Sequence, residues 1–188
     1  MMKKWYALKI FYNRFSEIEA TLSRDGIESY IPMKTRSYPQ PDGEVVTRRV
    51  PLVAMLMFLR CDDDYISSLN SILDGKAMVY HHPGTQIPAP IPDEEMDMFI
   101  MLTSSMEDGF EQIPYDGNLV KNAEKYRVTG GEDAGIVGYY RRIKKNKRLV
   151  IPFEGLLILV ATNYIPKNRV FFPILSRFPS HLCNTENK

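Results

Sequence analysis

The sequence lacks the features that mark membrane-spanning and disulfide-bonded proteins. Its apolar runs, such as LLILVAT at residues 156–162, fall far short of the roughly 20 residues that a membrane-spanning helix needs. The basic N-terminus is followed by an apolar stretch, but Lys9 and Asn13 interrupt it and no small-residue cleavage site follows, which favours a first strand over a signal peptide. With only two cysteines, Cys61 and Cys183, no disulfide framework is implied, so we expect a cytoplasmic protein without membrane contact.

Residues that carry catalysis or hold metals are also scarce. There are three histidines, and the neighbours His81 and His82 would point to opposite faces of a strand. No Cys-x-x-Cys motif and no phosphate-binding Gly-Lys-Ser/Thr motif occurs. Three aspartates at 62–64 fit either Mg²⁺ or the positively polarised start of a helix, and the helix start is the simpler interpretation. We therefore expect no enzyme, no cofactor and no metal.

The charge is divided unevenly along the chain. Residues 1–120 hold 11 Lys and Arg against 18 Asp and Glu, whereas residues 121–188 hold 13 against 5. Such a split suggests two modules with different partners. A basic C-terminal module fits nucleic acid, an acidic protein surface or mere solvation, and the charge alone leaves these open.

The first 105 residues show apolar patterns typical of a β-α-β-β-α-β-α order. This order predicts a ferredoxin-like α+β domain, with helices on one face of an antiparallel sheet and no helical cover on the other. An Asp42-Gly43 turn is typical of a hairpin between the second and third strands. The expected strands span residues 5–11, 27–38, 45–61 and 77–81, and the expected helices begin at Asn13, Asp62 and Asp93.

The remaining chain divides into a linker, a β-rich module and a tail. Residues 106–121 have no periodicity and predict a linker. Residues 122–173 contain five short β-like segments with tight turns, which predict a small barrel. We expect the tail at 174–188 to fray.

Glycines punctuate the start of this β-rich module. Gly130 and Gly131 would form a turn, and Gly135 and Gly138 would let the chain bend and reverse. The segment AEKYRVTGGEDAGIVGYYRRI resembles the KOW motif of small SH3-like barrels. It matches at Arg127, Val128, Gly131, Gly135, Ile136 and Gly138, and departs at Ala123 and Asp133.

The first half resembles the N-terminal (NGN) domain of the NusG family of transcription factors. The similar segments are WYALKIFYNRFSEIEATL, RRVPLVAMLMFLRCD and IPAPIPDEEMD, with Ala54-Met55 where the family has Pro-Gly. The resemblance covers about residues 5–172 in the family's order. The sequence is most similar to the UpxY branch of NusG paralogues, which are antiterminators of capsular-polysaccharide operons.

The resemblance implies RNA polymerase as the partner. In this family an apolar patch on the sheet binds the polymerase clamp helices, and by position the patch would include Lys9, Leu56, Phe58 and Tyr80. The alternative is that Leu56 and Phe58 are core residues beneath the helices, with their neighbours facing outward. Specialised members also touch the polymerase gate loop; the matching residues here are Ser67, Ser68 and Asn70, which ordinary helix exposure explains equally well.

Basic residues are candidates for nucleic-acid contact. In the first half, contact with non-template DNA or upstream duplex competes with simple solvation. In RRIKKNKR at residues 141–148, RNA phosphates, an acidic protein and a solvated turn remain open. The candidates are Arg14, Arg24, Lys34, Arg36, Arg48, Arg49, Arg141, Arg142, Lys144 and Lys145.

The family's barrel recruits other factors, such as a ribosomal protein or a termination factor. Phe153 is a candidate for that contact or a residue of the barrel core. Together these expectations describe a monomeric elongation factor or antiterminator that binds RNA polymerase, with non-template DNA or nascent RNA as further contacts. The alternative is an RNA-binding KOW protein of ribosome assembly or translation.

Overall fold

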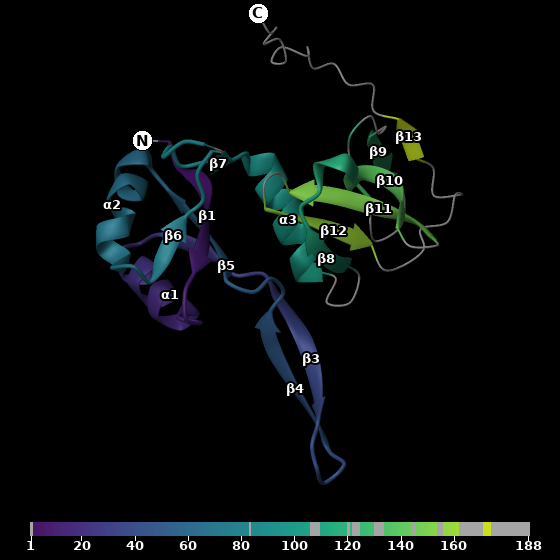
Figure 1. Cartoon of the computed structure of the whole chain (residues 1–188), viewed down its shortest axis with the longest axis horizontal. Helices are drawn as coiled ribbons and strands as arrows, with labels where there is room; N and C mark the ends of the chain where they lie inside the picture. The colour runs from purple at the N-terminus through teal and green to yellow at the C-terminus, as the bar shows by residue number, and fades with distance from the viewer. Residues whose placement is uncertain are drawn as a thin grey trace, which may run out of the picture. The chain divides into compact units, whose positions relative to one another are not determined.

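The chain forms two compact units, Met1–Gly109 and Phe110–Lys188 (Figure 1). The first is a mixed α+β unit and the second is rich in strands, which confirms the expected α+β class. This computed structural model describes residues 2–82, 84–105, 110–119, 121, 125–129, 134–143, 146–153, 156–161 and 171–173.

The first unit contains an antiparallel sheet in the order β2-β5-β1-β6, and β7 also pairs with β1. This is the strand order of the ferredoxin-like fold, because β5 lies between β1 and β2 while each helix connects strands that are not neighbours. The elements are β1 (Lys4–Ile10), α1 (Phe15–Arg24), β2 (Glu28–Tyr30), β5 (Leu56–Cys61), α2 (Asp63–Leu73), β6 (Ala77–Val79), β7 (Pro90–Ile91) and α3 (Asp93–Ser105).

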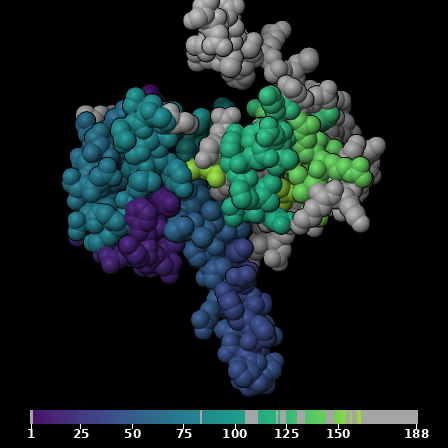
Figure 2. Space-filling view, viewed as in Figure 1, coloured from purple at the N-terminus to yellow at the C-terminus, as the bar shows by residue number. Residues whose placement is uncertain are grey.

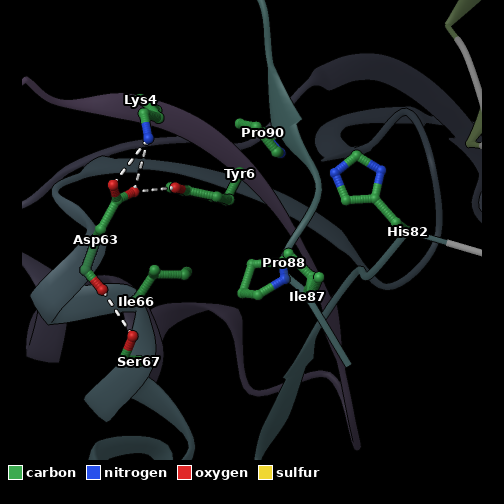
Figure 3. A pocket seen from close by; sticks show the side chains of 9 residues that line it. All are labelled: Lys4, Tyr6, Asp63, Ile66, Ser67, His82, Ile87, Pro88 and Pro90. Carbon is green, nitrogen blue, oxygen red and sulfur yellow. Dashed lines mark hydrogen bonds and ion pairs between the residues drawn. The ribbon is translucent and has the colours of Figure 1, made fainter. Parts of the chain in front are cut away.

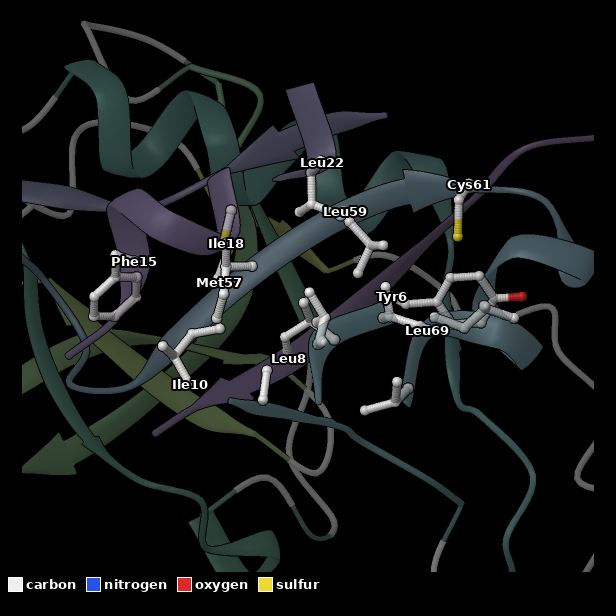
Figure 4. Packing of buried hydrophobic residues seen from close by; sticks show 14 residues of the cluster. Tyr6, Leu8, Ile10, Phe15, Ile18, Leu22, Met57, Leu59, Cys61 and Leu69 are labelled. Carbon is white, nitrogen blue, oxygen red and sulfur yellow. The ribbon is translucent and has the colours of Figure 1, made fainter. Parts of the chain in front are cut away.

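Helices α1 and α2 cover one face of this sheet (Figure 4). Alternate residues of the central strands, such as Leu8 of β1 and Met57 and Leu59 of β5, point toward the helices and are fully buried. Leu56 and Phe58 therefore point to the opposite face. The alternative is confirmed in that both are core residues, at 3% and 0% exposure, and wrong in placing them beneath α1 and α2.

Helix α3 packs on that opposite face. The Phe99 ring lies 5.2 Å from the Phe58 ring, centroid to centroid, and Phe58 is 0% exposed. The expectation of a sheet face without helical cover is therefore wrong around Phe58. The reason is an apolar stripe on α3, in which Met96, Phe99 and Leu102 are all buried.

Two strands that the sequence predicts as continuous are broken. A break at residues 31–32 separates β2 from β3 (Met33–Pro39), and a break before Leu56 separates β4 (Val45–Pro51) from β5. Among the described strands, β3 and β4 pair with each other alone, as a separate two-stranded sheet. Their Asp42-Gly43 turn confirms the predicted hairpin, since Gly43 has a φ of +87° and Asp42 accepts a hydrogen bond from the Glu44 N–H at 3.0 Å.

Met55, the last residue of the break before β5, has an unusual backbone conformation. Its φ is +61°, in the left-handed region that costs a non-glycine residue about 1–2 kcal/mol. The resemblance described above implies Pro-Gly where this chain has Ala54-Met55, so here a methionine takes a backbone conformation that glycine would adopt more readily. The Met55 carbonyl accepts a hydrogen bond from the Ile10 N–H at 2.7 Å, which holds the strained residue against β1.

The second unit is a six-stranded antiparallel sheet in the order β13-β9-β10-β11-β12-β8. Its first strand lies within the predicted linker, so the linker assignment is wrong over residues 110–114. The physical reason is that β8 supplies backbone partners for the otherwise unpaired edge of β12. The elements are β8 (Phe110–Pro114), η1 (Gly117–Leu119), β9 (Lys125–Val128), β10 (Val137–Ile143), β11 (Asn146–Phe153), β12 (Leu157–Ala161) and β13 (Phe171–Pro173).

The glycines of this unit have two different roles. Gly135 has a φ of +95° in the turn between β9 and β10, as a reversal requires. Gly138 does not bend the chain; it lies within β10, where an added Cβ would be 2.8 Å from the Val150 carbonyl oxygen. Gly130, Gly131, Ala123, Asp133 and the tail at 174–188 lie outside the described residues.

Replacing Gly138 by alanine is expected to destabilise the second unit by about 1–3 kcal/mol, because the new methyl group overlaps backbone that cannot rotate away. Urea unfolding of the full chain measures the change. Gly117→Ala is the matched control, since the nearest atoms to its Cβ are 3.9 Å away in the Tyr115 side chain. Equal stability of the Gly138→Ala and Gly117→Ala proteins would show that close approach is not the reason for Gly138.

Candidate functional site

One row of side chains crosses three strands on the sheet face opposite α1 and α2. Lys9 of β1 pairs with Leu56 of β5 on one side and with Met78 of β6 on the other. Residues directly opposite each other on neighbouring strands share a face. Leu56 is 3% exposed, whereas Met78 is 44% exposed. The row is thus buried at β5 and open to solvent at β6.

Tyr80 and Phe11 extend this row into a surface. Tyr80 lies two residues after Met78, on the same face, and its N–H donates to the Ala7 carbonyl at 3.0 Å. Partial burial raises the pKa of the Tyr80 hydroxyl, so the ring is partly packed while it remains neutral. The Lys9 Nζ lies 5.9 Å from the centroid of the Phe11 ring. We call Lys9, Phe11, Met78 and Tyr80 the β1–β6 patch.

The predicted docking residues therefore separate into two groups. Lys9 and Tyr80 lie in the β1–β6 patch and are partly exposed. Leu56 and Phe58 share their face but are almost completely buried, so they support the surface from below and present little area to a partner. Sequence reasoning missed Met78. The signal that could have found it is its place between Ala77 and Val79. Successive side chains of a strand point to opposite faces, so a residue between two buried neighbours points away from the core.

The aspartates at the start of α2 have defined partners. Asp62 caps the helix by accepting a hydrogen bond from the Tyr65 N–H at 2.9 Å, which confirms the helix-start interpretation. Asp63 accepts from the Lys4 Nζ at 2.8 and 2.9 Å and from the Tyr6 hydroxyl at 2.8 Å (Figure 3). Within the described ranges, no group of three His, Cys, Asp or Glu side chains is placed to hold a metal ion.

These contacts shift two pKa values in opposite directions. The hydrogen bond from Lys4, and then that from Tyr6, lowers the pKa of the Asp63 carboxyl below its usual range. Burial, and then the bond to Asp63, raises the pKa of the Tyr6 hydroxyl. The network thus holds a charged carboxylate between a lysine and a neutral tyrosine, and it fastens α2 to β1.

Ser67, Ser68 and Asn70 lie on exposed positions of α2, where the sequence places a second contact. The Ser67 hydroxyl donates to the Asp63 carbonyl at 2.7 Å and the Ser68 hydroxyl to the Asp64 carbonyl at 3.0 Å. Each hydroxyl keeps its oxygen free to accept a hydrogen bond. Ser67 also borders a shallow hollow of about 340 Å³, which Tyr6, His82, Ile87 and Pro88 help to line (Figure 3).

Within the first unit, the basic candidates lie at the two ends of α1 and on the β3–β4 hairpin. Arg14 lies 3.6 Å from Glu17, and Arg48 and Arg49 are neighbours on β4, so they point to opposite faces of the hairpin. Arg142 is exposed. Lys144 and Lys145 lie outside the described residues.

Arg141 and Phe153 have structural roles in the second unit. The Arg141 Nε donates to the Leu119 carbonyl at 2.6 Å and its Nη2 to the Lys121 carbonyl at 2.7 Å. These bonds hold Leu119 and Lys121 against β10, and contact of Arg141 with nucleic acid stays a prediction. Phe153 is 3% exposed, which confirms the core interpretation.

Comparison with known proteins shows which family the chain is part of. The family model described as "NusG: Transcription termination factor nusG" matches residues 3–100, more than half of the chain. The chain belongs to the NusG family. NusG proteins are non-enzymatic transcription factors that generally bind RNA polymerase.

Two further comparisons accompany this match. A solved structure titled "Domain interaction in Thermotoga maritima NusG" is similar, with 17% sequence identity, a TM-score of 0.46, and coverage of 86% of this chain and 93% of the other. A search of curated proteins finds no match. Among the described residues, no helix is long and apolar enough to cross a membrane.

The Asp63 network predicts a pH-dependent stability. A carboxyl whose pKa is lowered by folding stabilises the folded state above its usual pKa of about 4, and this stabilisation is lost as the pH falls through the lowered value. Asp63→Asn is therefore expected to lower the unfolding free energy at pH 7, with a difference that shrinks below about pH 4. Urea unfolding from pH 7 to pH 3 measures it.

The matched control is Asp64→Asn, which removes a charge from the same helix turn but leaves the contacts of Lys4 and Tyr6 intact. Since both aspartates interact with the helix dipole, the difference between the two variants isolates the network. The same pH dependence in both variants would contradict a specific role for Asp63.

Proposed function

We propose that this NusG-family chain is a transcription elongation factor that docks on RNA polymerase through the β1–β6 patch. The observation that carries the proposal is the incomplete cover of the sheet. Helix α3 buries Phe58 completely, whereas Met78 on the same face stays 44% exposed beside Lys9 and Tyr80.

The composition of the patch suits a protein partner. Methionine adapts its shape to an opposing surface, and tyrosine is enriched among the residues that dominate binding energy. Lys9 adds a positive charge that favours an acidic or helix-terminal group on the partner. Buried Leu56 and Phe58 hold the strands that carry these side chains, so their contribution to docking is indirect.

A second contact with the polymerase is proposed at Ser67, Ser68 and Asn70. Their side chains are short and polar, and two of them form bonds within α2 that fix the hydroxyl oxygens. Such fixed acceptors suit hydrogen bonds from a loop of the polymerase, as the family's gate-loop contact requires.

We further propose that the second unit is a KOW-type barrel and that the chain is an operon-specific antiterminator of the UpxY kind. The meander β9 to β12, with β13 returning beside β9, supports the barrel, as do Gly135 in the turn and Gly138 against β11. This unit would recruit a ribosomal protein or a termination factor. As part of the same proposal, the chain contacts nascent RNA and acts on the transcription of capsular-polysaccharide operons.

The test is binding of the full chain to RNA polymerase core enzyme from the same organism. Met78→Glu is expected to weaken binding at least about tenfold, because a carboxylate would be desolvated at the contact. Val45→Glu is the matched control: it places the same charge on a residue that is 63% exposed on β4, outside the patch, and should bind like the wild type.

Circular dichroism and the unfolding midpoint establish that both variants are folded. Wild-type affinity in the Met78→Glu protein would place docking elsewhere. If the wild-type chain does not bind polymerase but binds RNA, the ribosome-related function takes its place.

A further inference from the structure

The β3–β4 hairpin is a ribbon without a hydrophobic core of its own. Its strands pair over seven residues each, from Met33 opposite Pro51 to Pro39 opposite Val45, and it extends away from the rest of the first unit (Figures 1 and 2). An isolated two-stranded hairpin is marginally stable in water. A ribbon of this length is therefore better explained by contact with a partner than by its own packing.

The charge of the ribbon indicates what kind of partner it fits. Arg36 lies directly opposite Arg48, both are exposed, and like charges at such a pair are destabilising. Lys34 shares their face, and Arg49 lies on the other. No ion pair to these four side chains occurs within the part of the chain that the structure describes.

Acidic residues of the hairpin are confined to its turn. Asp42 caps that turn through the Glu44 N–H, so its carboxylate is engaged. The paired strands themselves carry only positive charge. This unbalanced charge would be relieved by a polyanion laid along the ribbon.

We propose that the β3–β4 ribbon binds duplex DNA by entering its major groove with the Arg36–Arg48 face toward the DNA. The major groove of B-form DNA, about 12 Å wide, admits a two-stranded β-ribbon, whereas the major groove of A-form RNA is too deep and narrow for side chains to read. Guanidinium groups bind phosphates and guanine edges through two parallel hydrogen bonds. Tyr38 lies on the same face, with its ring centroid 6.0 Å from the Arg36 guanidinium carbon.

This site differs from the pair that the sequence suggests. Arg48 and Arg49 are adjacent in the chain but point to opposite faces, while Arg36 and Arg48 are distant in the chain and adjacent on the ribbon. The proposal goes beyond polymerase docking and does not depend on it, because the DNA contact can be measured without polymerase.

The experiment measures binding of the full chain to a fluorescein-labelled DNA duplex of about 20 base pairs by fluorescence anisotropy, over a range of salt concentrations. Arg36→Ala/Arg48→Ala is expected to weaken binding at least about tenfold at low salt. It should also reduce the slope of log K against log salt by about 2, since each lost phosphate contact reduces it by about 0.9. The matched control is Lys3→Ala/Lys121→Ala, which removes two exposed charges elsewhere and should change affinity less than about threefold.

The variant is not expected to unfold, because it removes a repulsive pair and its unfolding midpoint should equal or exceed that of the wild type. If the double variant does unfold, the DNA affinities of the single variants Arg36→Gln and Arg48→Gln are measured in its place, and each is expected to be weaker than that of the wild type. Equal weakening by the control, absence of DNA binding by the wild type, or tighter binding of an RNA duplex would each overturn the proposal. Loss of DNA binding with intact polymerase binding would separate this result from the docking test.

Discussion

The first unit depends on a strand that is apolar on both faces. In β5 the residues from Leu56 to Leu59 are all buried, so both sides of the strand need cover from other parts of the chain. Helices α1 and α2 cover Met57 and Leu59, and the Phe99 ring of α3 covers Phe58. Helix α3 does not cover the whole face, since Met78 remains exposed two strands away. The β1–β6 patch lies on this face beyond the cover of α3, and it is the surface through which we propose that the chain docks on a partner.

Arg60 helps to set where the cover by α3 begins. Its Nη2 lies 2.9 Å from Asp93 at the start of α3, its Nη1 lies 3.8 Å from Glu28 of β2, and its guanidinium stacks 6.0 Å from the Trp5 ring. The ion pairs are partly exposed, so each contributes at most about 1 kcal/mol. Their main effect is to position α3. They hold its N-terminus near β2 and β5, toward the edge of the sheet opposite β6.

The sequence predicts the order of elements well where the signal is local. The helix cap at Asp62 and the Asp42-Gly43 turn both occur as expected, because neighbouring residues determine them. Features that depend on cross-strand register or on distant partners are not predicted. That Met78 lies beside Lys9 follows from the pairing of β6 with β1, which no local pattern shows, and the role of Arg141 depends on carbonyl groups about twenty residues earlier in the chain. The break at Met55 was missed because a methionine gives no sign of the left-handed conformation that it adopts.

The most direct test of the docking surface is site-specific photo-cross-linking. A photoreactive phenylalanine derivative replaces Met78 in the full chain, or Val45 in a control chain, and each protein is irradiated in complex with RNA polymerase. We expect a cross-link to polymerase from position 78 and none from position 45, because position 78 lies in the β1–β6 patch and position 45 does not. A chain that binds polymerase and cross-links from position 45 but not from position 78 would contradict it.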